Sequence, residues 1–291
     1  IRSFLRCGAR GMAADLLQAT LDRLDNLWTG TFLGKPALGL YSRAFVFASY
    51  PRMIVASPTQ AIAAGAYAEL GSDRAALSQA FFRSNAALLR AGFLLTGLLA
   101  VAAPELIVLL IGAKWLPMLP AFRLLLVFAL LDPIKQTVSQ LFVAVGRPGV
   151  VVQARLVQLG VLVAGLFSLG PRLGIAGVSL AVTAMQAAGL AILLTLARRH
   201  VEVSLTRLFA VPVLAFAAAL LAGLGTAALM AGTPVLQAAA KTGGFLLAYC
   251  LVLLALEGRQ VRELAAQLLA HRAERVRAHS EGVADPERTG R

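Results

Sequence analysis

Two carboxylates near the start of the chain are spaced for shared chemistry. Asp22 and Asp25 lie three residues apart in the helix-length stretch 10–30, RGMAADLLQATLDRLDNLWTG. At about 100° per residue, both fall on one polar face, and leucines occupy the opposite face. Carboxylates in this arrangement can bind a coupling proton or cation, or accept hydrogen bonds from substrate hydroxyls. The alternative is that Arg23 or a neighbouring helix neutralises them for structural reasons.

A cationic and an aromatic residue share one face of the next apolar stretch. Arg43, in the sequence GLYSRAF, and Tyr50 are seven residues apart, so they lie on the same side of a helix. A guanidinium group binds phosphate oxygens in a bidentate manner, which makes both residues candidates for binding a phosphorylated substrate. An arginine that extends its charge to the membrane interface is an equally good interpretation of Arg43. Arg52 follows Pro51, and a kink at the proline leaves the direction of Arg52 open.

A third polar group interrupts an otherwise apolar run. It contains Asp132, Lys135, Gln136 and Gln140. We expect Asp132 and Lys135 to form a structural ion pair, because pairing lowers the cost of holding charges inside a membrane. Gln136 and Gln140 are candidate substrate-binding residues, since their amides can form hydrogen bonds with sugars.

The composition is that of a membrane protein. Hydrophobic residues make up 59% of the 291 residues, charged residues 14%, and the mean hydropathy is +0.78. This balance excludes an ordinary soluble domain and predicts an all-α polytopic membrane protein. Residues 173–197 carry no charge and are long enough to cross a hydrocarbon core of about 30 Å. The carboxylates of residues 10–30 are then expected to face a wet interior, because acidic groups at membrane depth usually mark a site.

Eight membrane-spanning helices are expected. Their approximate bounds are 10–32, 41–68, 86–112, 117–145, 150–170, 173–197, 208–231 and 234–256. Arginines gather at alternate ends of these spans, which by the positive-inside rule places both termini in the cytoplasm. Residues 257–291 shift abruptly to a charged composition and predict a basic cytoplasmic tail that is partly disordered.

Several function classes are disfavoured. The net charge of +13 is distributed between apolar runs, so it indicates membrane topology and no nucleic-acid partner. Cys7 and Cys250 form no metal-binding spacing, and the chain has no nucleotide-binding loop, HExxH or GxSxG motif. We therefore expect a protein that is not an enzyme, with no catalytic residue, metal or cofactor. An ion gradient or the substrate gradient would supply the energy for transport.

Several connecting sequences resemble the C-terminal half of the Wzx-type oligosaccharide flippases. This family is the polysaccharide-biosynthesis branch of the multidrug/oligosaccharidyl-lipid/polysaccharide exporter superfamily. The stretches that carry the resemblance are LDNLWTGTFLG (24–34), LGLYSRAF (38–45), GAKWLPMLPAFRLL (112–125), AVGRPGVVVQARL (144–156) and LGIAGVSLAV (173–182). The combination of GLYSRA, G-x-K-W and GRP at these relative positions is the most specific part of it.

The resemblance implies a domain organisation. Family members have two lobes of six helices around a central cavity, often with two further helices at the C-terminus. Residues 10–200 would form the second lobe, residues 201–256 the two additional helices, and residues 257–291 the tail. Residues 1–9 would connect from a first lobe that lies outside this sequence.

The resemblance also implies a function. Lipid-linked oligosaccharide repeat units, carried on undecaprenyl pyrophosphate, would cross the bacterial inner membrane by alternating access during surface polysaccharide biosynthesis. Membrane lipids, a polysaccharide polymerase and glycosyltransferases are the expected partners. Within this scheme Arg43, Tyr50, Gln136 and Gln140 would bind substrate, and Asp22 and Asp25 would couple transport to an ion. A drug/cation antiporter of the related multidrug branch remains the main alternative, and a membrane scaffold for polymerisation is a third.

Overall fold

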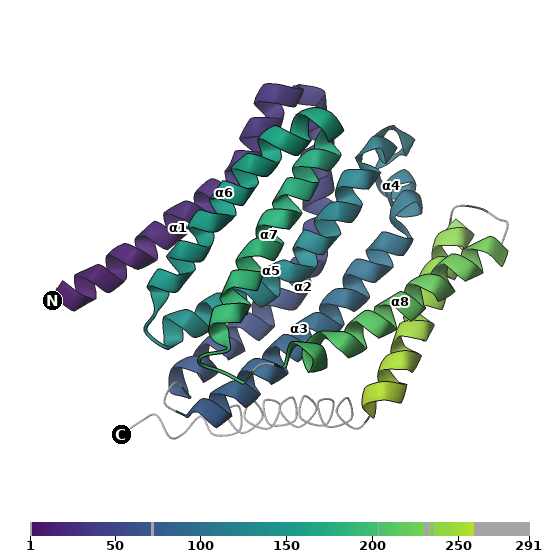
Figure 1. Ribbon diagram of the computed structural model, residues 1–291. Coiled ribbons are helices and arrows are strands. Elements are labelled where there is room, and N and C mark those ends of the chain that lie inside the picture. The colour runs from purple at the N-terminus through teal and green to yellow at the C-terminus, as the bar shows by residue number, and fades with distance from the viewer. Residues whose placement is uncertain (1, 71–72, 203, 230–232, 234, 259–291) are drawn as a thin grey trace, which may run out of the picture.

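The chain folds into long helices joined by short turns, as the computed structural model shows (Figure 1). The structure describes residues 2–70, 73–202, 204–229, 233 and 235–258. The helices in chain order are α1 (Arg2–Trp28), the π-helix η1 (Thr29–Leu33), α2 (Lys35–Glu69), α3 (Arg74–Val101), α4 (Ala103–Ile111), the 3₁₀-helix η2 (Ala113–Met118), α5 (Leu119–Ala144), α6 (Pro148–Leu173), α7 (Ile175–Ala197), α8 (Leu205–Leu229) and Val235–Gly258, called the terminal helix below.

The prediction of an all-α polytopic membrane protein is confirmed. Six helices in the described part of the chain are long and apolar enough to cross a membrane. They are α3, η2 continued by α5, α6, α7, α8 and the terminal helix. The long helices α1 and α2 are not among these six, so the count of eight spans is not confirmed. Most of the predicted tail, residues 259–291, lies outside the described residues.

One predicted span is wrong in its continuity. Residues 86–112 were expected to form a single helix, but α3 ends at Val101 and α4 begins at Ala103. Pro104 lies in the first turn of α4, where its missing N–H and its ring prevent α3 from continuing. The helix therefore breaks inside an apolar segment whose one charged residue, Glu105, lies directly after the proline.

The bundle is built as a series of neighbouring pairs. Contacts join α1 to α6, α6 to α7, α7 to α5, α5 to α2, α2 to α3, and α3 to α8. Gly177 of α7 and Gly165 of α6 allow a close approach, because a Cβ at Gly177 would overlap the carbonyl oxygen of Leu169 and one at Gly165 would press against Ala181. Small residues commonly permit such packing between membrane helices.

Two buried ion pairs fix the terminal helix against the rest of the bundle. Lys241 Nζ lies 2.5 Å from Glu105 Oε1 of α4, and Arg90 Nε of α3 lies 2.6 Å from Glu257 Oε2. The hydroxyl of Tyr249 donates a hydrogen bond to the carbonyl of Arg90. These contacts attach the terminal helix to α3 near one end and to α4 near the other.

The apolar core is divided into two clusters. On α5, the buried apolar residues from Ala121 to Ala129 belong to one cluster, and those from Ile134 to Phe142 belong to the other. The same change of cluster occurs along α6 and α7. The buried polar residues Asp132, Gln158 and Gln186 lie at the level between the two clusters.

Candidate functional site: a polar layer in the middle of the bundle

Six polar side chains from four helices meet at the level between the two apolar clusters. We call this group the polar layer; it consists of Arg52 (α2), Asp132, Lys135 and Gln136 (α5), Gln158 (α6) and Gln186 (α7). The position of each residue along its helix brings the group to one level. Sequence neighbours supply only the α5 members.

Asp132 is the centre of the layer. Its Oδ1 accepts a hydrogen bond from Gln186 Nε2 at 2.9 Å and lies 3.6 Å from Lys135 Nζ. Its Oδ2 accepts hydrogen bonds from Gln136 Nε2 at 2.8 Å and from Arg52 Nη1 at 3.1 Å. A buried carboxylate needs partners of this kind because losing its water is costly. Asp132 therefore ties α2, α5 and α7 together.

Two amides extend the layer toward α6. Lys135 Nζ donates a hydrogen bond to Gln186 Oε1 at 3.1 Å. Gln158 Nε2 approaches the same oxygen at 3.5 Å and the carbonyl of Met185 at 3.4 Å. Gly189 makes room for this approach, because a Cβ there would overlap the Gln158 side chain.

The layer opens to the surface on one side. Asp132 and Lys135 are only 2% and 5% exposed, whereas 28% of the Arg52 side chain is exposed. The Arg52 guanidinium carbon lies 5.7 Å from the centre of the Phe128 ring, a cation–π distance. Arg52 is thus a charged group whose inner side binds Asp132 and whose outer side remains accessible.

Further charges lie near the buried Lys135. Arg155 of α6 pairs with Asp15 of α1 at 3.7 Å, and Asp15 is exposed. Asp22 and Arg155 lie within electrostatic range of Lys135. Charges of both signs from α1 and α6 therefore act on this lysine.

The two predicted ion-coupling carboxylates have different surroundings. Asp22 is exposed and accepts a hydrogen bond from Gln18 at 2.8 Å. Asp25 is 2% exposed, and its Oδ2 accepts a hydrogen bond from the hydroxyl of Tyr41 at 2.5 Å. The backbone N–H of Asn26 donates to Asp25 Oδ1 at 2.7 Å. Asp25 therefore links α1 to α2, and Asp22 faces outward one turn away.

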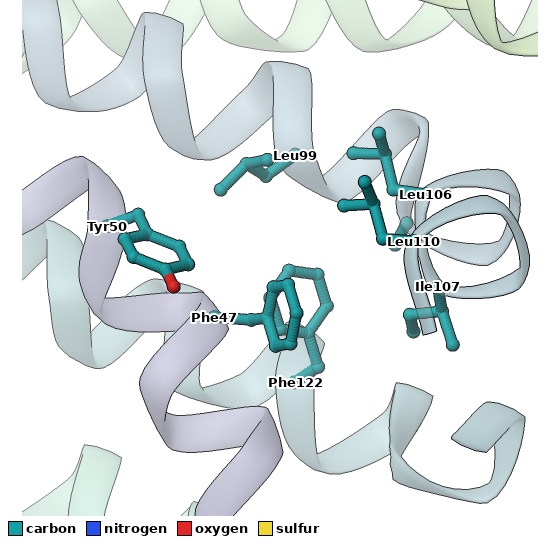
Figure 2. A pocket seen from close by; sticks show the side chains of 8 residues that line it. Phe47, Tyr50, Leu99, Leu106, Ile107, Leu110 and Phe122 are labelled. Carbon is teal, nitrogen blue, oxygen red and sulfur yellow. The ribbon is translucent and has the colours of Figure 1, made fainter. Parts of the chain in front are cut away.

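The predicted substrate-binding residues occupy separate places. Gln136 belongs to the polar layer, and Gln140 lies one turn further along α5 with a buried Oε1 that has no hydrogen-bond partner. Arg43 is exposed, and its guanidinium carbon lies 5.8 Å from the ring of Trp115 in η2. Tyr50 lines an apolar pocket apart from the layer (Figure 2).

Three members of the layer did not emerge from the sequence. The proline before Arg52 leaves the direction of that side chain open, and Gln158 and Gln186 were not predicted as candidates. The usable signal was the few amides inside the two long apolar runs: Gln153 and Gln158 in 150–170, and Gln186 in 173–197. A buried amide needs a partner, and two such amides on sequential helices are candidates for mutual contact. Within the described ranges, no group of three or more His, Cys, Asp or Glu side chains is arranged to hold a metal ion.

Comparison with known proteins agrees with this architecture. The family model described as "Polysaccharide biosynthesis protein" matches residues 1–120. The fold matches that of the lipid II flippase MurJ in an inward closed conformation, with a TM-score of 0.70 and 13% identity. The resemblance to Wzx-type flippases is confirmed. A search of curated protein sequences found no match.

The flippase fold is shared over most of the chain. The MurJ match covers 83% of this chain and 52% of MurJ, so the chain spans about half the length of that protein. An outward-facing multidrug resistance MATE family transporter of the MOP superfamily matches with a TM-score of 0.57 and 17% identity. That match covers 87% of this chain and 68% of the transporter. At these identities the two structures show a common fold.

Proposed function

We propose that this chain forms one lobe of a transporter that moves undecaprenyl-pyrophosphate-linked oligosaccharide repeat units across the bacterial inner membrane by alternating access. Residues 10–200 would form the lobe and residues 201–256 the two additional helices. Residues 1–9 would connect it to a first lobe. The observation that carries the proposal is the polar layer, which holds Arg52 with one side bound and one side accessible. The family resemblance supplies the substrate class.

The chemistry of the layer suits a substrate that is both charged and rich in hydroxyls. The accessible side of Arg52 can donate hydrogen bonds to acceptor oxygens in the sugar part of the substrate, and a planar guanidinium can bind two of them at once. Gln136 lies beside it, and its amide oxygen can accept a hydrogen bond from a sugar hydroxyl. Asp132 holds Arg52 in place, so the cation is positioned before the substrate arrives. A charge cluster at this depth is costly to maintain, which favours a functional reason for its presence.

Asp22 and Asp25 are proposed as the groups that respond to the coupling ion. Asp22 is accessible to water and lies within electrostatic range of Lys135 in the layer. Asp25 joins α1 to α2 through Tyr41, so a change in its charge would alter the contact between these helices. Binding of a proton or sodium ion at either carboxylate would then bias the position of α1.

The test is a flipping assay with the full-length protein in proteoliposomes. A lipid-linked oligosaccharide is placed in the membrane, and the fraction that becomes accessible to an added glycosidase is followed over time. Arg52→Gln should lower the initial rate about tenfold or more, because a charge-assisted hydrogen bond contributes about 1.5–3 kcal/mol. Arg52→Lys should retain an intermediate rate, since lysine keeps the charge but lacks the planar guanidinium that binds two oxygens at once.

The matched control is Arg123→Gln, which removes an exposed arginine of α5 outside the layer. Its rate should equal that of the wild type. An Arg52→Gln protein that flips substrate at the wild-type rate, at equal abundance in the vesicles, would refute the role of the polar layer.

A drug/cation antiporter is the second candidate function. The exposed carboxylates Asp15 and Asp22 favour it, because they would attract a cationic drug. The same proteoliposomes can be loaded with a cationic dye under a proton or sodium gradient. Dye transport that is lost in Asp22→Asn, together with no flipping of lipid-linked sugar, would favour the antiporter. Genes for glycosyltransferases and a polymerase beside this gene would favour the flippase and identify its expected partners.

A further inference from the structure

An apolar pocket lies on α2 away from the polar layer. Its volume is about 150 Å³. Phe47 and Tyr50 of α2 and Phe122 of α5 form one side, and the end of α3 and the inner face of α4 form the other (Figure 2). Figure 2 shows the Tyr50 hydroxyl pointing toward the two phenylalanines. That hydroxyl is the only side-chain polar group among the lining residues.

The pocket results from the break between α3 and α4. Leu99 lies before the break and Leu106 after it, and both line the pocket. Glu105, next to Leu106, is held by Lys241 of the terminal helix at 2.5 Å. The ion pair attaches α4 to the terminal helix. The pocket is therefore a fixed feature of the fold, set by Pro104 and a buried ion pair.

A cation lies above the pocket toward the Lys35 end of α2. Arg43 is seven residues before Tyr50 on the same face, about 10 Å along the helix. Its guanidinium lies over Trp115, and among the described residues no carboxylate pairs with it. Tryptophan favours the membrane interface, which places this end of the pocket at head-group level.

We propose that this pocket binds the first isoprene units of a polyprenyl pyrophosphate lipid, with the pyrophosphate on Arg43. The inference rests on the proposed function for the identity of the lipid. An apolar cavity of about 150 Å³ lined by Leu, Ile and Phe admits a molecule the size of benzene. Benzene has six carbons and an isoprene unit has five. The pocket therefore takes a short part of one branched chain and leaves the rest in the bilayer.

Along α2, the cation and the apolar pocket come in the same order as the head group and the chain of the lipid. The head group would lie at the interface beside Arg43, and the chain would run from there toward the middle of the membrane past Phe47 and Tyr50. The aromatic rings of the pocket offer flat faces to the planar double bonds of the chain. The pocket would thus hold the carrier while the sugar occupies the polar layer on another face of α2.

The experiment uses a photo-crosslinking amino acid at two neighbouring positions of α4. Leu110 lines the pocket and is 63% exposed; Leu109 does not line it and is 48% exposed, which makes it the matched control. Full-length protein with p-benzoylphenylalanine at either position is reconstituted in phosphatidylethanolamine–phosphatidylglycerol vesicles containing radiolabelled polyprenyl pyrophosphate, and is then irradiated. Each protein is also made with Arg43→Gln.

Label should be incorporated at residue 110 and only at background level at residue 109. Arg43→Gln should reduce the labelling at residue 110 about tenfold, the effect of losing a charge-assisted contact. Unlabelled farnesyl pyrophosphate should compete, and farnesol should not. Equal labelling at the two positions, or labelling at residue 110 that ignores Arg43, would overturn the proposal. So would radiolabelled phosphatidylglycerol that labels residue 110 as strongly, because the pocket would then hold ordinary bilayer lipid.

The two proposals fail separately in these measurements. A protein that flips the sugar lipid in an Arg52-dependent manner but labels both positions equally would refute the pocket and leave the transport function intact. A protein that labels residue 110 in an Arg43-dependent manner but shows no flipping would refute the transport function and leave the lipid site intact.

Discussion

At the scale of single residues, Asp132 shows how a costly group is held inside a membrane protein. Two amides and two cations surround its carboxylate, and each oxygen contacts one of each kind. The negative charge offsets the positive charges of Arg52 and Lys135, and the amides complete the hydrogen bonding. Removing one partner of such a cluster leaves the others buried without compensation.

Asp132→Asn should therefore destabilise the protein strongly. The asparagine amide would face donors that need an acceptor, and Lys135 would remain buried without its counter-charge. We expect a loss of about 3–5 kcal/mol, measured as thermal unfolding in detergent. Asp22→Asn is the control and should change stability by less than about 0.5 kcal/mol, because Asp22 is exposed. Adding Lys135→Met to Asp132→Asn should restore part of the loss; equal stability of Asp132→Asn and wild type would contradict the structural role.

At the scale of helices, close packing of α6 against α7 sets the polar layer. Gln158 and Gln186 meet only because the two helices approach closely enough for side chains at their midpoints to touch. Gly177 and Gly189 permit this approach, the first by admitting the backbone of α6 and the second by admitting Gln158. These two glycines therefore determine whether Gln158 and Gln186 can meet in the polar layer.

Gly177→Ala should lower the thermal stability and weaken the layer. Its Cβ would overlap the carbonyl oxygen of Leu169, a backbone atom that cannot rotate away. The expected cost is about 1–3 kcal/mol. Gly225→Ala in α8 is the matched control, because a Cβ there meets open space. This control should be neutral or stabilising by up to about 1 kcal/mol. If Gly177→Ala leaves the thermal stability unchanged as well, α6 and α7 can separate without cost.

At the scale of the whole molecule, basic residues are distributed unevenly between the two ends of the bundle. Arg74, Arg147, Arg198 and Arg199 lie at the turns where α2, α5 and α7 lead into the next helix, at the lower end in Figure 1. Lys35 and Lys114 lie at the opposite end. The positive-inside rule then predicts that the lower end faces the cytoplasm. The terminal helix also ends there, so the C-terminus would be cytoplasmic.

A labelling experiment tests this orientation. Single cysteines are introduced as Lys114→Cys and Arg147→Cys in a protein whose Cys7 and Cys250 are replaced by serine. Both new positions are exposed at opposite ends of the bundle. In intact cells a membrane-impermeant maleimide should label residue 114 and not residue 147. The reverse pattern, or an active alkaline phosphatase fused after Gly258, would place the C-terminus outside.

The sequence by itself determined the class of the protein and the approximate positions of most of its helices. Hydropathy, charge distribution and the GLYSRA, G-x-K-W and GRP stretches were sufficient for an all-α membrane fold and for the resemblance to polysaccharide flippases, because these signals are local in the chain. The spacing of Asp132 and Lys135 also indicated an ion pair, since residues three apart lie on the same side of a helix. The break at Pro104 could have been predicted, because a proline does not continue a helix. The apolar run around Pro104 was instead interpreted as one continuous span.

Only the tertiary structure decided which polar residues meet. Arg52 reaches Asp132 across 80 residues of sequence, and Gln186 reaches it across 54. The hydroxyl of Tyr41 binds Asp25 in a buried contact between α1 and α2, whereas Asp22 is exposed. Helical periodicity fixes the face on which a residue lies, but the partner of that face depends on how the helices pack, and packing is a property of the whole bundle.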